Sequence, residues 1–210
     1  MTYDSAFLKT MFANVATAIE ADSDRLCALD GVIGDADHGI AMGLGFSAAR
    51  DAVAALGSDA DPTTIFNTAA KSFLNAVGAS SGPLYATAFM RAGAAVKGKV
   101  TLTDQDLVAA FQAMAQGIKD RGKAEPGDKT MIDAWAPAAD AAAGVIAAGG
   151  SAAESLRAAQ TAAANGAEAT KGMVALKGRS ARLGERSIGH MDPGAASAVT
   201  VVKAMAEAAQ

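Results

Sequence analysis

The sequence predicts an all-α protein, with eight helices arranged as an antiparallel up-and-down barrel or bundle. Two observations support this prediction. Apolar residues recur at steps of three and four along most of the chain, which is the spacing of a helix with one buried face. The composition is 51% hydrophobic but only 5% aromatic, and the many alanines and glycines favour closely packed helices over a β-sandwich.

The helices can be placed in order from their apolar stripes and their start signals. An apolar stripe from Phe7 through Ile19 to Leu29 predicts the first helix, and the second starts at or just after Asp37. We expect the remaining helices to begin near residues 62, 84, 104, 131, 152 and 193. A strand is conceivable only at residues 199–202, which is too short a stretch to build a sheet.

Several of these helix starts carry recognisable capping residues. Asp61 and Asp192 each precede a proline, a combination typical of an N-cap followed by the first helical residue. The pairs Thr103/Asp106 and Ser151/Glu154 resemble capping boxes. Thr130 is the expected cap of the sixth helix.

Length and charge limit the classes of protein to consider. A chain of 210 residues predicts one domain spanning residues 1–210. The formal net charge of −4 indicates no nucleic-acid partner. No apolar run is long enough to span a bilayer, and no signal peptide is evident, so we expect a soluble cytoplasmic protein without a membrane partner.

Most chemically active residues fall in four connecting segments, at 30–39, 78–83, 121–130 and 178–194. By the helix order above, these segments follow the first, third, fifth and seventh helices. Alternate connections of an antiparallel bundle lie at the same end. The sequence therefore predicts that all four segments meet at one end of the bundle.

The segment 30–39 is the strongest candidate for a binding site. Asp30, Asp35 and Asp37 lie close together among glycines, followed by His38 and a helix start. Carboxylates in such proximity repel each other unless cations neutralise them, and a helix N-terminus favours an anion. This pattern favours Mg²⁺ together with phosphate over a solvated turn in which Asp37 merely caps the helix. A calcium hand is excluded, because the twelfth position counted from Asp30 or Asp35 is Ala41 or Phe46 instead of Glu.

The other segments contain two partial motif matches. Residues 78–82 fit the G-x-S-x-G pattern of a hydrolase, but that motif requires a preceding strand, whereas a helical stripe precedes it here. Residues 122–130 nearly match a P-loop, but Asp128 separates Gly127 from Lys129. We therefore expect Ser80 and Ser81 to suit phosphate oxygens, with arginines of the last segment neutralising charge.

Three longer motifs resemble a known family. Residues 34–39, 122–131 and 184–194 read GDADHG, GKAEPGDKTM and GERSIGHMDPG, and they resemble the three signatures of the dihydroxyacetone kinase L subunit, the nucleotide-binding subunit. The resemblance extends over the whole chain. It implies an eight-helix antiparallel barrel that holds ADP or ATP and two Mg²⁺ ions at one end.

The resemblance also implies roles for individual residues. Asp30, Asp35 and Asp37 would bind the two magnesium ions. The phosphates would be met by His38, Gly39, Ile40, Ser80 and Ser81. The nucleotide pocket would be lined by Gly122, Met131, Arg179, Asp192, Pro193 and Gly194. No covalent nucleophile is required on this chain, because positioning and charge neutralisation carry phosphoryl transfer.

In the family, the ketose is bound on a separate K subunit, and a phosphotransferase-system protein can rephosphorylate the bound ADP. The sequence departs from the family at Ala41, where Asn is common, and at Met191, where Gln is common. Ala41 lacks an amide to reach a phosphate. Three alternatives stay open at this point: an ATP-dependent kinase subunit for another ketose such as erythrulose, a non-catalytic Mg²⁺–nucleotide regulatory module, and a serine hydrolase using Ser80 with His38 or His190.

Overall fold

The computed structural model describes residues 2–78 and 81–210, and within them the fold is all-α, as predicted. The described residues form eight α-helices and contain no strand, only an isolated β-bridge between Tyr3 and Leu102. The helices are α1 (Ser5–Ile33), α2 (His38–Ala54), α3 (Pro62–Ala76), α4 (Ser81–Ala95), α5 (Asp104–Gly122), α6 (Ile132–Ala147), α7 (Ala152–Ala169) and α8 (Pro193–Ala208).

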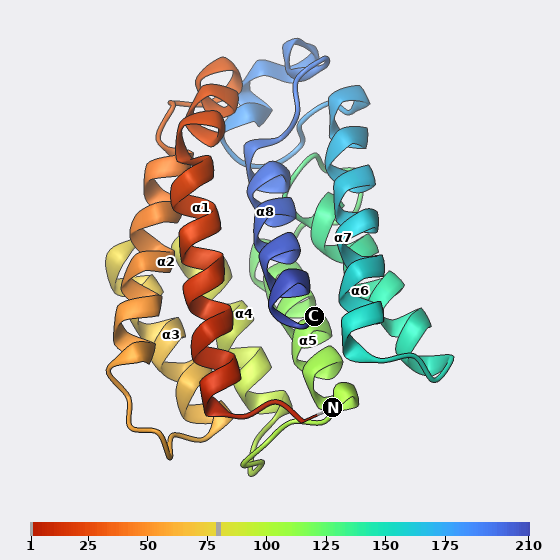
Figure 1. Ribbon diagram of the computed structural model, residues 1–210. Helices are drawn as coiled ribbons and strands as arrows, with labels where there is room; N and C mark the ends of the chain where they lie inside the picture. Colours follow the sequence, from red (N-terminus) through yellow and green to blue (C-terminus); the bar gives the residue numbers. More distant parts are fainter. Residues whose placement is uncertain (1, 79–80) are drawn as a thin grey trace.

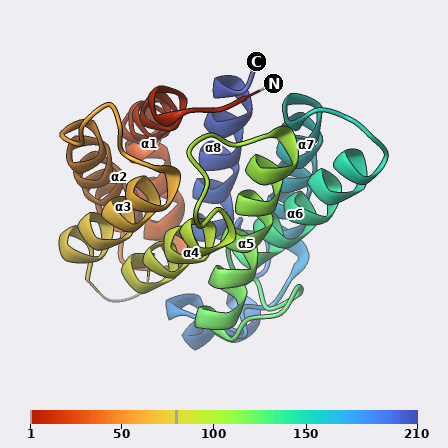
Figure 2. The ribbon, with the colours of Figure 1, turned by 90° about the horizontal axis from the view of Figure 1, so that it is seen from below.

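The helices form a closed ring, because each packs against its neighbours in sequence and α8 packs against α1 (Figures 1 and 2). All eight contribute to one hydrophobic core, which includes Phe12, Phe46, Trp135 and Val201. This continuous core is consistent with the single domain expected from the length, which stays a prediction. None of the helices in the described residues has the length and apolar character needed to cross a membrane.

Small residues allow the helices to approach closely, as the composition indicated. A Cβ at Gly166 on α7 would lie 1.9 Å from the Asp133 carbonyl oxygen on α6. A Cβ at Gly39 on α2 would lie 2.0 Å from the Ser23 carbonyl oxygen on α1. Both distances are far below a van der Waals contact, so only glycine fits at these two positions.

The predicted caps are present at four helix starts. Asp61 and Asp192 accept the backbone N–H of Thr64 and Ala195, and Thr103 and Ser151 form complete capping boxes. At α6 the assigned N-cap is Met131, one residue after the expected Thr130, but Thr130 Oγ1 accepts the Ile132 N–H at 3.2 Å and so caps the start of this helix as predicted. The Asp133 carboxylate accepts the Thr130 N–H at 2.8 Å, so the helix start is held from inside its first turn.

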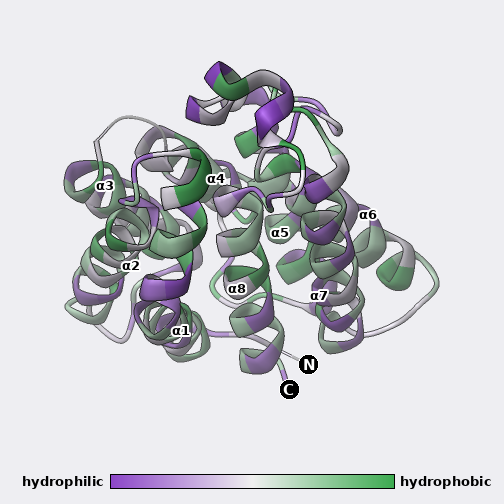
Figure 3. Cartoon of the chain, turned by 90° about the horizontal axis from the view of Figure 1, so that it is seen from above, coloured by the Kyte–Doolittle hydropathy of each residue, from purple (hydrophilic) through white to green (hydrophobic). Residues whose placement is uncertain are grey.

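Two helix boundaries and one connection also differ from the sequence expectation. Helix α1 continues to Ile33, which places Asp30 on its last turn and not in a loop. Helix α4 begins at Ser81 instead of Leu84. The connection between α7 and α8 contains two 3₁₀ segments, η1 (Thr170–Gly172) and η2 (Arg179–Ser187), and η2 is kinked at Gly184, whose φ of 56° is not helical. Figure 3 looks onto this end of the barrel, where hydrophilic stretches are prominent in that connection.

Candidate functional site

A cavity of about 740 Å³ opens at the end of the barrel where α1, α3, α5 and α7 terminate. Residues from all four connecting segments line it, including Asp37, Gly78, Ala124 and Arg179. The prediction that these segments meet at one end is therefore confirmed. A cavity of this size is typical of a small-molecule or cofactor site.

Asp30 is the buried member of the acid cluster. Its carboxylate accepts the backbone N–H of Asp37 at 3.1 Å and that of His38 at 3.3 Å, which ties the end of α1 to the start of α2. A Cβ at Gly34 would lie 2.1 Å from Asp30 Oδ1, so glycine is needed there to leave room for this carboxylate. Asp30 is thus fixed by its surroundings before any ligand binds.

Asp35 and Asp37 are exposed and complete the cluster. Ala36 between them adopts a left-handed conformation with φ of 64°, which is costly for a residue with a Cβ and is typical of functional sites. One carboxylate oxygen from each of Asp30, Asp35 and Asp37 lies within 4.8 Å of the other two. Hard cations such as Mg²⁺ bind oxygen ligands arranged in this way.

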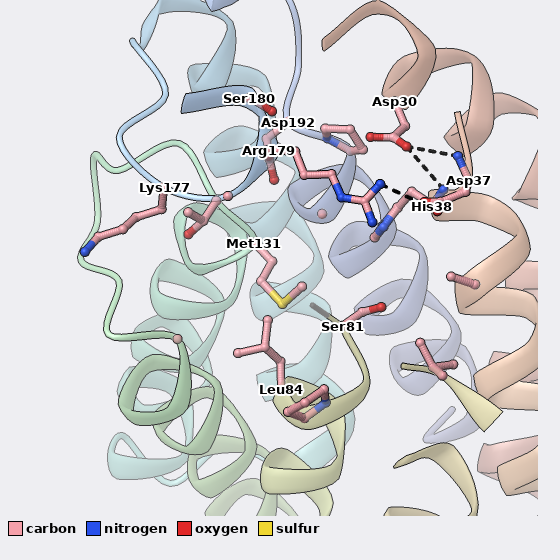
Figure 4. Close-up of a pocket in the computed structure, with 18 of the residues that line it drawn as sticks. Asp30, Asp37, His38, Ser81, Leu84, Met131, Lys177, Arg179, Ser180 and Asp192 are labelled. Carbon is pink, nitrogen blue, oxygen red and sulfur yellow. Dashed lines mark hydrogen bonds and ion pairs between the residues drawn. The ribbon is translucent and has the colours of Figure 1, made fainter. Parts of the chain in front are cut away.

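The structure argues against Asp37 as a simple helix cap. Asp37 occupies the N-cap position of α2, but its side chain makes no capping hydrogen bond. Its Oδ2 lies instead 3.6 Å from the Arg179 guanidinium, which also forms an ion pair with Asp35 (Figure 4). The acids therefore face the cavity and a cation, and not their own helix.

His38, the first residue of α2, is half-buried and lines the cavity next to the acid cluster. Its Nε2 lies 2.9 Å from the hydroxyl oxygen of Ser197 on α8. Burial lowers the pKa of His38, and the charge of Asp30 only partly opposes this effect. The imidazole therefore favours its neutral form, and its hydrogen bond to Ser197 links the start of α2 to α8.

The opposite side of the cavity is apolar. Leu84 and Met131 project into it from α4 and the start of α6, well apart from Asp30 and Asp37 (Figure 4). Ile118 and Ala124 extend this wall. A ligand with one polar and one flat apolar end fits such a site, with the polar end at the acids.

The Gly-Lys segment between α5 and α6 differs from a P-loop in structure as well as sequence. Helix α5 precedes it, and Asp133 accepts the Gly127 N–H at 2.6 Å, fixing the turn internally. Lys129 lines the cavity, but its side chain is buried and donates to backbone carbonyls. Burial lowers the pKa of Lys129, whereas the charge of Asp192 raises it.

Asp192 caps α8 at the inner wall of the cavity, accepting the Ala195 N–H at 2.8 Å. Burial raises the pKa of Asp192 to about 7, and the charges of Asp133 and Asp30 act in the same direction. The carboxyl is therefore poised to change protonation near neutral pH.

Most of the residues predicted to form the site line this cavity. They are Asp30, Asp35, Asp37, His38, Ile40, Ala41, Ser81, Gly122, Met131, Arg179, Asp192, Pro193 and Gly194. Ser80 lies outside the described residues. Gly39 is not among the lining residues, because its Cα faces α1, but its backbone belongs to the first turn of α2, where N–H groups lack helical acceptors.

The sequence alone did not identify part of the lining, which includes Leu44, Val77, Leu84, Ile118, Ala124, Lys129, Lys177 and Ser180. The apolar members resemble ordinary core positions of their helices, so their spacing carried no separate signal. Arg182, Arg186, His190 and Met191 are absent from the lining. Residues 62–76 before the G-x-S-x-G match are helical, which removes the structural context that a hydrolase nucleophile requires.

The chain matches one protein family over most of its length. The DAK2 domain family matches residues 32–207. The "PEP-dependent dihydroxyacetone kinase, ADP-binding subunit DhaL" of Escherichia coli K12 is 42% identical over 189 residues, which cover 90% of each chain. A DhaL subunit of Listeria innocua, from PEP-dependent dihydroxyacetone kinase 1, is 38% identical over 98% of this chain and 97% of that protein.

A solved structure shows the same fold. The dihydroxyacetone kinase of C. freundii, crystallised with AMP-PNP and Mg²⁺, superposes with a TM-score of 0.73 and 28% identity. The alignment covers 96% of this chain but 34% of that kinase. The chain thus spans about a third of the length of that larger protein.

Proposed function

This chain belongs to the DAK2 domain family, among the ADP-binding subunits of dihydroxyacetone kinases, and from this we propose its function. The chain would hold ADP or ATP through two Mg²⁺ ions, and it would pass the terminal phosphoryl group to a short ketose. The ketose, dihydroxyacetone in the first instance, would be bound on a separate K subunit in the cytoplasm. A phosphotransferase-system protein would rephosphorylate the bound ADP.

The observation that carries this proposal is the pairing of an acid cluster with an apolar wall across one cavity. Asp30, Asp35 and Asp37 supply the oxygen ligands that Mg²⁺ prefers, and their oxygens lie close enough to share ions. Bound Mg²⁺ would neutralise the phosphate charges and polarise the transferring group. Leu84, Ile118 and Met131 offer the surface on which a nucleobase would pack.

The remaining lining residues would bind and orient the phosphates. The backbone N–H groups of Gly39 and Ile40, in the first turn of α2, are suited to phosphate oxygens. The N–H of His38 is already donated to Asp30, so His38 would meet the phosphates with its side chain. Ser81, the first residue of α4, would add a hydroxyl donor, and Ser80 is proposed from the sequence alone to add a second. Arg179 would move from the acids to the phosphates once cations occupy the cluster.

No nucleophile on this chain is needed in this proposal. The terminal phosphoryl group would pass directly between the nucleotide and the ketose, so the residues of this chain act by positioning and by charge neutralisation. The open end of the cavity must then face the ketose site of the K subunit.

A reconstituted assay tests the proposal. Purified protein is combined with a K subunit, a phosphotransferase-system donor and phosphoenolpyruvate, and ketose phosphate is measured with dihydroxyacetone or erythrulose as acceptor. We expect dihydroxyacetone phosphate to form while ADP stays bound through extensive dialysis. Asp35→Asn should lose this activity, whereas Asp24→Asn, on the exposed face of α1, should keep it.

Three results would contradict parts of the proposal. Phosphorylation of erythrulose but not dihydroxyacetone would change the acceptor. Ready exchange of bound ADP with free ATP would overturn the resident-nucleotide mechanism. Nucleotide binding without any transfer to a ketose would indicate a regulatory module instead of a kinase subunit.

A further inference from the structure

Lys129 is the one lysine among the buried polar residues of the described chain, with a relative exposure of 1%. Its ammonium donates to the backbone carbonyl oxygens of Thr170 at 2.7 Å, Ser187 at 2.7 Å and His190 at 2.6 Å. The Met173 carbonyl lies at 3.2 Å. Four carbonyl dipoles therefore surround the charge and replace its hydration shell.

This arrangement leaves the ammonium no capacity to bind a phosphate. A lysine has three N–H donors and no acceptor, and here four carbonyl oxygens already share them. The near match of residues 122–130 to a P-loop is thus misleading about the role of this lysine. Its head group points under the connecting segment and not at the polar end of the cavity.

The four carbonyls come from the two ends of a single segment. Thr170 and Met173 lie at the start of residues 170–190, which we term the cap segment, and Ser187 and His190 lie at its end. The backbone bond from Gly189 N–H to the Lys171 oxygen, 2.7 Å long, joins the same two ends. Lys129 therefore fastens the base of a closed loop whose middle contains Arg179.

Arg179 is the residue of the cap segment that reaches the acid cluster. It forms an ion pair with Asp35 and lies 3.6 Å from Asp37 Oδ2 (Figure 4). Its side chain is about half exposed, so its position depends on the backbone that carries it. That backbone is bonded at both of its ends to the Lys129 ammonium.

We propose that Lys129 is a positioning residue, which holds the cap segment and its Arg179 over the acid cluster. When the Lys129 side chain is removed, the four carbonyl oxygens that surround its ammonium will accept a small external ammonium ion instead. Lys129 holds the cap segment in this way whether or not a nucleotide is bound. The consequence for ligand affinity rests on the proposed function and is tested separately.

A second lysine with the same left-handed backbone conformation, Lys123, provides a matched control for Lys129. Lys129 has φ of 59° and Lys123, in the same connection, has φ of 49°. Both are lysines in an unfavourable conformation, but Lys123 is exposed. Lys123→Ala and Lys129→Ala therefore impose the same chemical and backbone change, and they differ in the loss of the buried ammonium.

The first experiment measures amide hydrogen exchange of residues 174–186 in protein free of metal and nucleotide. We expect exchange in Lys129→Ala to be about tenfold or more faster than in wild type, since bonds to a charged donor are lost. Lys123→Ala should match wild type. Propylammonium, which replaces the atoms removed beyond Cβ, should restore slow exchange, whereas tetramethylammonium, which has no N–H donor, should not. Unchanged exchange in Lys129→Ala, or equal effects of both ions, would overturn the proposal.

A second experiment uses wild-type protein and holds even if the variant does not fold. Lysines are acetylated under native conditions, and the modified positions are mapped with and without Mg²⁺ and ADP. We expect Lys129 to stay unmodified in both conditions and Lys123 to react in both. Rapid modification of Lys129 in free protein with protection by ADP would show a phosphate-binding lysine and contradict the proposal.

The link to the ligand is tested by the affinity for ADP with Mg²⁺. In Lys129→Ala we expect weaker binding that propylammonium restores in parallel with slow exchange. Restored exchange without restored affinity would refute the link between the cap segment and the ligand. Absence of ADP binding by wild type would refute the proposed function while leaving the exchange result valid.

Discussion

The guanidinium of Arg179 forms an ion pair with the carboxylate of Asp35, although the two residues belong to connecting segments far apart in the sequence. Arg179 also lies 3.6 Å from Asp37 Oδ2, so one arginine pairs with both exposed acids of the cluster and offsets one of their two negative charges. A cation that binds these acids must compete with this arginine. Arg179 therefore connects the state of the acid cluster to the position of the cap segment.

Replacing Arg179 should have opposite effects on metal and nucleotide. In Arg179→Ala, Mg²⁺ alone should bind more tightly, by up to about fivefold, since an exposed ion pair contributes about 1 kcal/mol or less. ADP with Mg²⁺ should bind more weakly, because the phosphates lose a cationic partner. Titration calorimetry measures both affinities. Arg182→Ala removes an exposed arginine of the same 3₁₀ helix that does not line the cavity, and it should change neither.

Gly34→Ala should disturb the site without unfolding the barrel. The added Cβ would overlap Asp30 Oδ1, so the carboxylate must turn away from the N–H groups of Asp37 and His38. We expect Mg²⁺-dependent ADP binding to fall at least about tenfold while the circular dichroism spectrum is unchanged. Gly172→Ala is the control, because a Cβ at Gly172 would have no atom within 4 Å. Full retention of binding would argue against Asp30 as a ligand.

Gly39→Ala should act mainly on stability. Its Cβ would clash with the Ser23 carbonyl oxygen of α1, which a rigid backbone cannot relieve at low cost. We expect a loss of about 1–3 kcal/mol in the free energy of unfolding, measured by urea denaturation. Gly43→Ala lies on the same helix with open space around it, and it should be neutral or slightly stabilising. Equal stability of both variants would contradict the close contact.

The pKa of Asp192 gives a pH dependence with a definite sign. Burial raises this pKa from its ordinary value of 3.8 to about 7, so the folded protein binds more protons than the unfolded chain between these values. This contribution to stability is complete below pH 3.8 and is lost as pH rises through 7. The loss is on the order of a few kcal/mol.

In the wild type, the free energy of unfolding should fall between pH 5 and pH 8 as Asp192 ionises. In Asp192→Asn this fall should be absent, because asparagine carries no titratable proton. Thermal unfolding of the ligand-free protein at the two values measures the effect. Asparagine also caps helices well, and Asp61→Asn at the exposed cap of α3 controls for the change of capping group. An unchanged pH dependence in Asp192→Asn would show that Asp192 is ionised throughout this range.

Local sequence signals account for most of the fold. An N-cap side chain bonds to a backbone N–H only two or three residues later, so a cap can be recognised from the local sequence. This is why sequence alone predicts the helix starts that follow Asp61, Thr103, Ser151 and Asp192. The glycines that follow Asp30 predict a loop at this residue. In the structure α1 continues past Asp30, whose side chain interacts with the first residues of α2. The start of α4 was misjudged because Pro83 suggested a break, whereas it lies within the first turn of that helix.

The site was less accessible from sequence where it depends on contacts between distant segments. The acids and glycines at residues 30–39 are visible as a pattern, and the order of helices brought the other three segments to the same end. The burial of Lys129 depends on carbonyls 41–61 residues away, and no spacing rule reveals it. The apolar wall at Leu84 and Ile118 is likewise set by packing between helices.

The central claim is that the acid cluster holds a nucleotide through Mg²⁺. Titration calorimetry of ADP into apo protein, with Mg²⁺ or with EDTA, tests it most directly. We predict tight binding only with Mg²⁺, its loss in Asp35→Ala and Asp37→Ala, and its retention in Asp24→Asn. Equal ADP affinity with and without Mg²⁺, or full affinity in both aspartate variants, would contradict the account.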